Sequence, residues 1–178
     1  MKLLSLDPSL TCTGWAVWNV SDCWREVDLE DFDNIKTCPE DAGNDEDVDN
    51  DRLWYISESI NKIIKDCDIE QVVYEKDCPY NYTGRGRGQK NMDKYRRAVT
   101  YIYAHCTIAV GRKNVYGVFA DTWKGSEKKH ATIKNVNLLY GLDLKKKDND
   151  IADAIAVGHW FIKRQRIPQK RISYNFTG

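Results

Sequence analysis

Residues 2–20 read KLLSLDPSLTCTGWAVWNV, and this stretch decides the expected fold. Residues 2–7 have the apolar character of a short buried strand that ends at an acid, and residues 14–20 have that of a second strand. The Pro8–Thr13 segment between them is short and rich in hydroxyl groups, as expected of a turn. The stretch therefore predicts a hairpin, and a third strand is expected within residues 24–36.

The rest of the chain alternates between helical and extended patterns. Leu53, Ile56 and Ile60 recur at a spacing of three to four residues, which predicts a helix with Asp51 as its N-cap. The expected elements after the hairpin are a helix over 52–66, strands over 69–75 and 115–119, and helices over 91–110, 126–140 (with Ser126 as N-cap) and 150–164. This order predicts a single α/β domain over residues 1–178 with a mixed sheet of about five strands.

Composition places the chain among globular proteins. Of its 178 residues, 42% are apolar and 30% charged, and no apolar run approaches the length of a membrane span. The apolar start of the chain is too short for a signal peptide, so we expect no membrane partner and a cytoplasmic location, in a bacterial cell or a phage-infected host. Six cysteines without a CxxC pair are expected to be reduced thiols rather than zinc ligands.

Charge is strongly divided along the chain, although the formal net charge is zero. Residues 1–75 are rich in Asp and Glu, notably in an expected acidic loop over 37–51, whereas residues 76–178 are rich in Lys and Arg up to a basic tail over 164–178. Asymmetry on this scale favours a polyanionic partner on one face, and we expect nucleic acid. Solvated charge without a partner is the alternative.

Four acids occupy notable places in the expected elements. Asp7 and Glu75 each end a predicted strand, at the edge of an α/β sheet where ligand sites gather. Asp150 and Asp153 are three residues apart near the start of a predicted helix, and so lie on one face of it. A solvated strand end would account for Asp7 or Glu75 alone, and the helix dipole accounts for Asp150 better than for Asp153. The combination is much less probable by chance than any one feature.

Carboxylates gathered in this way suit hard divalent cations. Two Mg²⁺ ions about 3.5–4 Å apart, with Mn²⁺ as a substitute, could activate a water and stabilise the leaving 3′ oxygen of a phosphodiester. Such a mechanism requires no histidine as general base. His159 is six residues after Asp153, on a different face of the helix, and is expected to be a packing or surface residue.

The chain resembles the RuvC family of Holliday junction resolvases, in the RNase H-like superfamily. The resemblance rests on three segments, and the Asp-x-x-Asp-Ala-x-Ala pattern in the third is the most specific. The segments are Leu4–Val17, Val72–Glu75 and Asp150–His159. The resemblance implies an RNase H-like sheet flanked by helices. It also implies a homodimeric, magnesium-dependent endonuclease that makes paired nicks in four-way DNA. It also implies that Asp7, Glu75, Asp150 and Asp153 are catalytic metal ligands.

The resemblance further implies contacts with DNA. Residues 122–129 resemble a lysine-bearing turn that contacts DNA in the family, so Lys124 and Lys128 or Lys129 would take that role. Family members also place an aromatic residue near the junction centre shortly after the catalytic Glu, and Tyr80 or Tyr82 is within reach. The acidic loop and the glycine-arginine stretch over 83–90 are not hallmarks of the family.

The residues of the basic stretch over 83–90, together with the tyrosines before it, also suggest nucleic-acid binding independently of the family. Arg85, Arg87 and Lys90 lie among glycines and could follow phosphates, while Tyr80 and Tyr82 could stack on exposed bases. A flexible solvated loop is the alternative. The helix over 91–110 carries more apolar surface than one sheet face requires, which favours a homodimer, although core packing explains about half of that stripe.

Three functions therefore compete. The first is a metal-dependent endodeoxyribonuclease that resolves Holliday junctions and other branched DNA in recombination and repair. The second is a catalytically inert junction-binding module, against which the presence of all four carboxylates argues. The third is an ATP-using phosphotransferase of the actin type, suggested by the spacing of Asp7 and Gly14, but 178 residues leave no room for its second domain.

Overall fold

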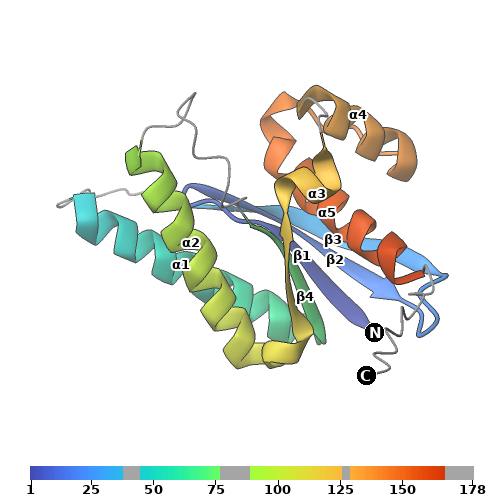
Figure 1. Cartoon of the computed structure of the whole chain (residues 1–178), viewed down its shortest axis with the longest axis horizontal. Helices are drawn as coiled ribbons and strands as arrows, with labels where there is room; N and C mark the ends of the chain where they lie inside the picture. The colour runs from blue at the N-terminus through green and yellow to red at the C-terminus, as the bar shows by residue number, and fades with distance from the viewer. Residues whose placement is uncertain (38–44, 77–88, 126–128, 167–178) are drawn as a thin grey trace, which may run out of the picture.

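A computed structural model describes residues 1–37, 45–76, 89–125 and 129–166, without the side chains of 45–47, 89–91, 129 and 166. One five-stranded sheet lies between two pairs of helices (Figure 1). The strands are β1 (Lys2–Asp7), β2 (Cys12–Val20), β3 (Val27–Lys36), β4 (Gln71–Lys76) and β5 (Val115–Phe119). The helices are α1 (Asp45–Asp66), α2 (Gln89–Val110), α3 (Ala120–Lys124), α4 (Lys129–Tyr140) and α5 (Asn149–Arg166), with short 3₁₀ turns at Arg112–Asn114 and Lys146–Asp148.

The sheet is mixed and has the strand order β3-β2-β1-β4-β5. Strands β1, β2 and β3 form an antiparallel meander, and β4 and β5 continue from β1 in parallel. Parallel neighbours need crossover connections, which α1 and α2 supply. The predicted hairpin, the third strand and the α/β class with a mixed sheet are all confirmed.

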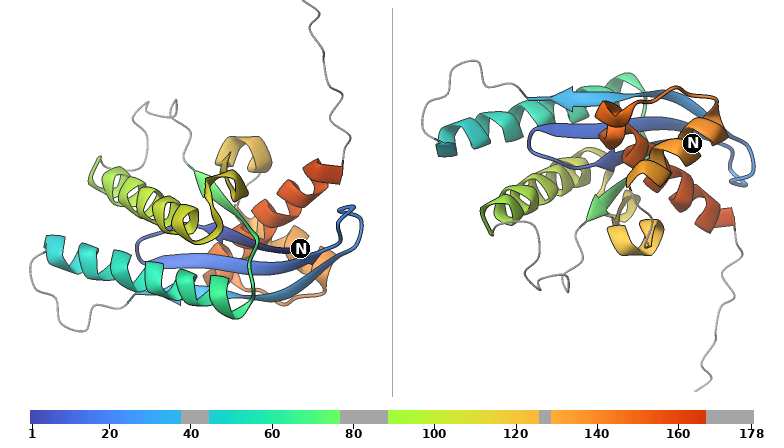
Figure 2. Two further views of the ribbon diagram at one scale, coloured as in Figure 1. Left: turned by 90° about the horizontal axis from the view of Figure 1, so that it is seen from below. Right: turned by 90° about the horizontal axis from the view of Figure 1, so that it is seen from above.

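The core has two halves, one on each face of the sheet (Figure 2). Alternate residues of a strand point to opposite faces, so Leu4 and Leu6 pack with α1 and α2, whereas Leu3 packs with α5. Ile56, Ile60 and Ile64 of α1 repeat at helical spacing and are buried against the first face. The sequence pattern of β1 therefore fixes which side of the sheet each neighbouring residue faces.

The acidic segment is partly helical, which corrects the expected loop over 37–51. Helix α1 begins at Asp45, so Asp51 is not an N-cap but lies inside the helix, while residues 38–44 lie outside the described part. Acids in the first turns of a helix are favoured by its dipole. Asp49 is also buried and forms ion pairs with Lys94 and Arg97 of α2, at 3.2 and 3.8 Å. These contacts hold the start of α1 against α2.

Several other boundaries differ from expectation. Strand β4 runs over Gln71–Lys76 instead of 69–75, so Glu75 is its penultimate residue and not its last. The segment after β5 was expected to be a turn, yet Ala120–Lys124 forms the short helix α3, which ends at Gly125 with a φ of 56°. The basic tail expected over 164–178 begins inside α5, because that helix continues to Arg166. Ser126, the expected N-cap of α4, lies outside the described residues. No helix in the described part of the chain has the length and apolar character to cross a membrane.

Candidate active site

Strands β1 and β4 place Asp7 beside Glu75. The two strands are parallel neighbours, and Leu6 is registered with Tyr74, so the acids that follow occupy the next matched position. Leu6 and Tyr74 face the half of the core formed with α1 and α2. Because side chains alternate along a strand, Asp7 and Glu75 face the other side, where α5 lies.

Helix α5 reaches this edge of the sheet because Gly14 has no side chain. Gly14 pairs with Asp7 across the hairpin. A Cβ added at Gly14 would lie 2.0 Å from the carbonyl oxygen of Asp150 and 2.9 Å from the amide nitrogen of Ile151. The backbone of the first turn of α5 therefore rests directly on β2, next to Asp7. This contact brings Asp150 to the two strand-end acids.

A second glycine, Gly158, lies about two turns further along α5 and allows the helix to approach the sheet closely. A Cβ at Gly158 would lie 2.5 Å from the indole nitrogen of Trp18 and 2.6 Å from the hydroxyl oxygen of Ser5. That indole N–H donates to the Ser5 hydroxyl at 2.8 Å. Ala152 and Ala154, between the two contacts, are fully buried. The small residues of the helix thus allow α5 to pack closely on the sheet, and they orient Asp153 toward the sheet edge.

The four acids are close enough to affect one another electrostatically. Burial, and then the negative charges of Glu75, Asp153 and Asp150, raise the pKa of Asp7 well above its usual value. The nearby ammonium of Lys124 lowers it. The structure therefore brings together all four carboxylates that the sequence singled out, and it surrounds Asp7 with the other three.

The short helix α3 supplies two hydrogen-bond donors to this group of acids. The indole nitrogen of Trp123 donates to Oε2 of Glu75 at 2.9 Å. The ammonium of Lys124 lies 2.6 Å from Oδ2 of Asp153, a carboxylate that is almost fully buried. Lys124 was expected to contact DNA. In the structure, its positively charged ammonium group lies within the acidic cluster. Trp123 was not foreseen, since its role depends on a helix that the sequence did not reveal.

Cys12 is a further neighbour that the sequence did not mark as functional. Burial, and then a hydrogen bond with the Asp150 carboxylate, raise the pKa of the Cys12 thiol to about 12. It therefore stays protonated at neutral pH and can donate to Asp150. Cys12, Cys23, Cys67 and Cys106 are free thiols, as expected, while the other two cysteines lie outside the described residues.

The acid cluster suits divalent cations by its chemistry. In the described part of the chain, no group of three or more His, Cys, Asp or Glu side chains is arranged so that it could hold a metal ion as it stands. Lys124 and Trp123 engage two of the four carboxylates. Burial is the main cause of the raised pKa of Asp7, and the neighbouring carboxylates raise it further. A hard cation with oxygen ligands would offset the negative charge of these carboxylates. In chemical type, the oxygen donors of these four acids are the ligands that hard divalent cations prefer.

Most of the other expected DNA contacts lie outside the described residues. This applies to Tyr80, Tyr82, Arg85, Arg87 and Lys128. The backbones of Lys90 and Lys129 belong to the first turns of α2 and α4, but their side chains are not described. The role of these residues stays a prediction.

His159 is a packing residue, as expected. Its Nδ1 forms a hydrogen bond with the Tyr140 hydroxyl, and the two rings meet edge to face. This pair joins α4 to α5 away from the acids. The described geometry of the cluster thus rests on carboxylates, Trp123, Lys124 and Cys12.

Comparison with known proteins gives a consistent answer about the fold. No protein-family model matches the chain, and no curated protein matches its sequence. Among solved structures, Thermus thermophilus RuvC in complex with a Holliday junction substrate has a TM-score of 0.67 at 18% identity, over 93% of this chain and 98% of that one. The fowlpox virus resolvase in complex with Holliday junction DNA has a TM-score of 0.59 at 14% identity, over 92% and 98%.

A third similar structure comes from a eukaryote. The yeast mitochondrial Holliday junction resolvase has a TM-score of 0.62 at 10% identity, over 92% of this chain and 78% of that one. All three alignments extend over more than nine tenths of this chain. The fold expected from the three sequence segments is therefore confirmed, and the chain has the RNase H-like fold of RuvC and its structural relatives.

Proposed function

We propose that this protein is a metal-dependent endodeoxyribonuclease that cuts Holliday junctions and other branched DNA by phosphodiester hydrolysis. The observation that supports the proposal best is the gathering of four carboxylates around Asp7, at the sheet edge of a fold shared with junction resolvases. Divided charge along the chain adds a basic half that suits a polyanionic substrate. Recombination and repair are the processes that such an activity would serve.

Two strands and one helix position the four acids for the proposed reaction. Asp7 and Glu75 are held by neighbouring strands, and Asp150 and Asp153 by the first two turns of α5, so their carboxylates would hold two Mg²⁺ ions. Bound there, the ions would supply an activated water and would neutralise charge on the leaving 3′ oxygen. Trp123 fixes the orientation of Glu75 through its indole N–H. Lys124 offsets negative charge at Asp7 and Asp153 and could also meet a DNA phosphate.

A cleavage assay on branched and linear DNA tests the proposal. The protein is incubated with a labelled four-way junction or a matched linear duplex, each with Mg²⁺ or with EDTA. Paired nicks that require both the junction and Mg²⁺ are the expected result. Binding without cleavage in any divalent metal would instead indicate an inert junction-binding module, and ATP turnover independent of DNA would indicate a phosphotransferase.

Substitution Trp123→Phe is expected to slow cleavage and to leave junction binding nearly unchanged. Phenylalanine keeps an aromatic ring but cannot donate to Glu75, and a hydrogen bond to a charged group contributes about 1.5–3 kcal/mol. If that contribution acts in the transition state, kcat should fall about 10- to 100-fold. Single-turnover cleavage and a binding titration in Ca²⁺ separate the two effects. The matched control is Trp54→Phe, at an exposed indole on α1, and an equal loss there would refute the role of Trp123.

We also propose that the protein acts as a homodimer that carries two active sites. Ile102 and Cys106 of α2 are buried against the sheet, which accounts for much of the apolar stripe. Ile108 on the same helix is 82% exposed and is available to a second copy. Analytical ultracentrifugation is expected to show a dimer, and Ile108→Asp should shift it toward the monomer. A monomer at all working concentrations would contradict this part of the proposal.

A further inference from the structure

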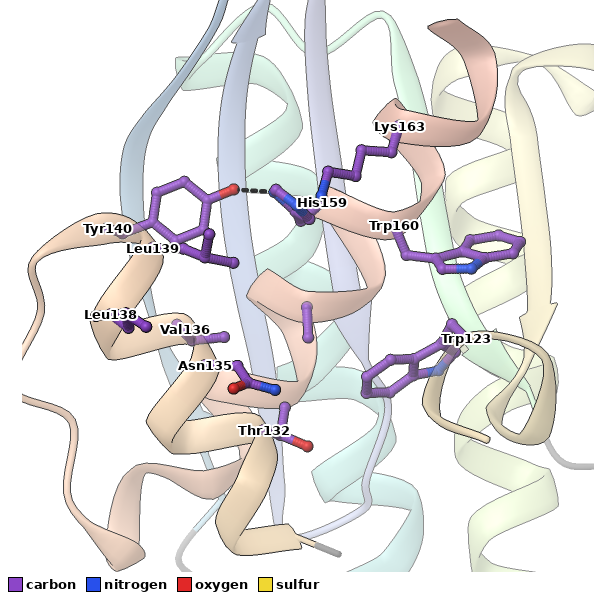
Figure 3. Close-up of a pocket in the computed structure, with 11 residues that line it drawn as sticks. Trp123, Thr132, Asn135, Val136, Leu138, Leu139, Tyr140, His159, Trp160 and Lys163 are labelled. Carbon is purple, nitrogen blue, oxygen red and sulfur yellow. Dashed lines mark hydrogen bonds between the residues drawn. The ribbon is translucent and has the colours of Figure 1, made fainter. Parts of the chain in front are cut away.

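A groove of 430 Å³ lies between α4 and α5 and reaches Trp123 (Figure 3). Its volume falls within the range of about 300–1,000 Å³ that is usual for small-molecule sites. Trp123 and Trp160 line one side, and Val136 and Leu139 of α4 line the other. Tyr140 and His159 close one end.

The groove combines aromatic faces with positive charge. Trp123, Tyr140 and Trp160 contribute rings, and among the described lining residues there is no acid. Lys163 lies at the rim, and the guanidinium of Arg164 sits 5.5 Å from the centre of the Trp160 ring. Aromatic side chains beside a basic edge are the usual means of binding unpaired nucleotides, since rings stack on bases and cations meet phosphates.

Polar groups on α4 could also contact the edge of a base. Asn135 is exposed, and its amide points from α4 toward Trp123. An Asn side chain offers both donor and acceptor groups, which match the hydrogen-bonding edge of a nucleobase. Leu138, 81% exposed, and Leu139, 57% exposed, leave the apolar border of the groove open to solvent.

Trp123 connects this groove with the acid cluster. The same indole that lines the groove donates its N–H to Glu75 at 2.9 Å, and in Figure 3 its six-membered ring faces α4. Lys124, the next residue, lies 2.6 Å from Asp153. A group that stacked on Trp123 would therefore be separated from the catalytic carboxylates by a single side chain.

We propose that this groove binds one unstacked nucleobase of the DNA strand being cut. The inference rests on the proposed nuclease function and adds to it a basis for substrate selection. A base at a branch point is already partly unpaired, whereas a base inside a linear duplex must first be extruded at an energetic cost. Stacking on Trp123 would also fix the indole that orients Glu75, so an occupied groove would favour cleavage.

Photocrosslinking tests the inference directly. A four-way junction carrying 5-iodouracil at one position at a time next to the branch is bound to the Asp7→Asn protein without Mg²⁺, irradiated and mapped by mass spectrometry. Crosslinks to Trp123, Tyr140 or Trp160 from at least one branch position are the expected result. Crosslinks that all fall outside the groove would overturn the inference. This measurement does not need cleavage, so it can fail or succeed independently of the nuclease activity.

A blocking substitution gives a second, independent measurement. Asn135→Trp places a large side chain in the groove, and it is expected to reduce junction cleavage about tenfold or more, the magnitude of one lost base stack. Lys134→Trp is the matched control, since Lys134 is the exposed neighbour on α4 and does not line the groove. Equal cleavage by both folded variants would overturn the inference. A change in sedimentation of DNA-free Asn135→Trp would also overturn it, because the groove would then hold a second copy of the chain.

Discussion

Asp7→Asn is expected to abolish junction cleavage while junction binding persists. Asp7 lies at the centre of the acid cluster, where three other carboxylates act on it. An amide of the same shape would remove one charged group from the proposed metal site, and metal ions contribute several kcal/mol of transition-state stabilisation. A loss of at least about 10³-fold in cleavage rate follows. Gel-based cleavage in Mg²⁺, together with binding in Ca²⁺, measures both properties, and retained cleavage would refute the assignment of the site.

The same substitution is expected to stabilise the metal-free protein. The pKa of Asp7 is raised in the folded state, so its ionised form opposes folding. The penalty is absent below about pH 3.9, the unfolded value, and grows as pH rises above it. At neutral pH in EDTA, the Asp7→Asn protein should therefore melt at a higher temperature than the unsubstituted one. Asp28→Asn, at an exposed position on β3, is the control and should leave the melting temperature nearly unchanged.

Gly14→Ala is expected to disrupt both folding stability and activity. The added methyl group would lie 2.0 Å from the backbone oxygen of Asp150, and backbone cannot move aside as a flexible side chain can. Overpacking of this kind usually costs about 1–3 kcal/mol, and here it must also push the start of α5 away from Asp7. We expect a lower melting temperature and a cleavage rate reduced about 10²-fold, because small misplacements of catalytic groups have large effects.

The control for this experiment is Gly117→Ala on β5. A methyl group there would meet the Cδ atom of Lys76 at 2.8 Å and the hydroxyl oxygen of the buried Tyr74 at 2.9 Å. Both contacts are with side chains and are longer than the 2.0 Å backbone contact at Gly14, so the substitution should cost less stability than Gly14→Ala and should keep more of the activity. An equal or greater loss at Gly117 would show that the close approach of α5 is not the special feature of Gly14.

Local patterns were sufficient to predict much of the fold. β1 and β5 have the bounds expected from their apolar runs. Asp7 at the end of β1 and Glu75 next to the end of β4 lie where parallel strands bring them together. The start of α1 could not be predicted in this way, because it depends on Asp49 meeting Lys94 and Arg97 of α2, far along the chain. Tertiary contacts of this kind leave no periodic signal in the sequence.

The supporting residues of the site were harder to foresee than its acids. Carboxylates at strand ends are conspicuous in an apolar context, but Trp123 lies in a five-residue helix that is too short for a recognisable pattern. The role of Cys12 was equally hard to foresee, because only the position of α5 shows that its thiol meets Asp150. The Trp-Lys pair four residues after the end of a predicted strand was the available signal, and it was interpreted for Lys124 alone.

The pairing of β1 with β4 has a consequence for how this protein can change. Neighbouring strands are held about 4.8 Å apart by backbone hydrogen bonds, whatever side chains they carry. The separation of the Asp7 and Glu75 backbones is therefore set by main-chain geometry. Apolar residues throughout the core can be exchanged for others of similar volume without altering that backbone separation. The sequence can therefore diverge extensively while the distance between the backbones of the two acids stays the same.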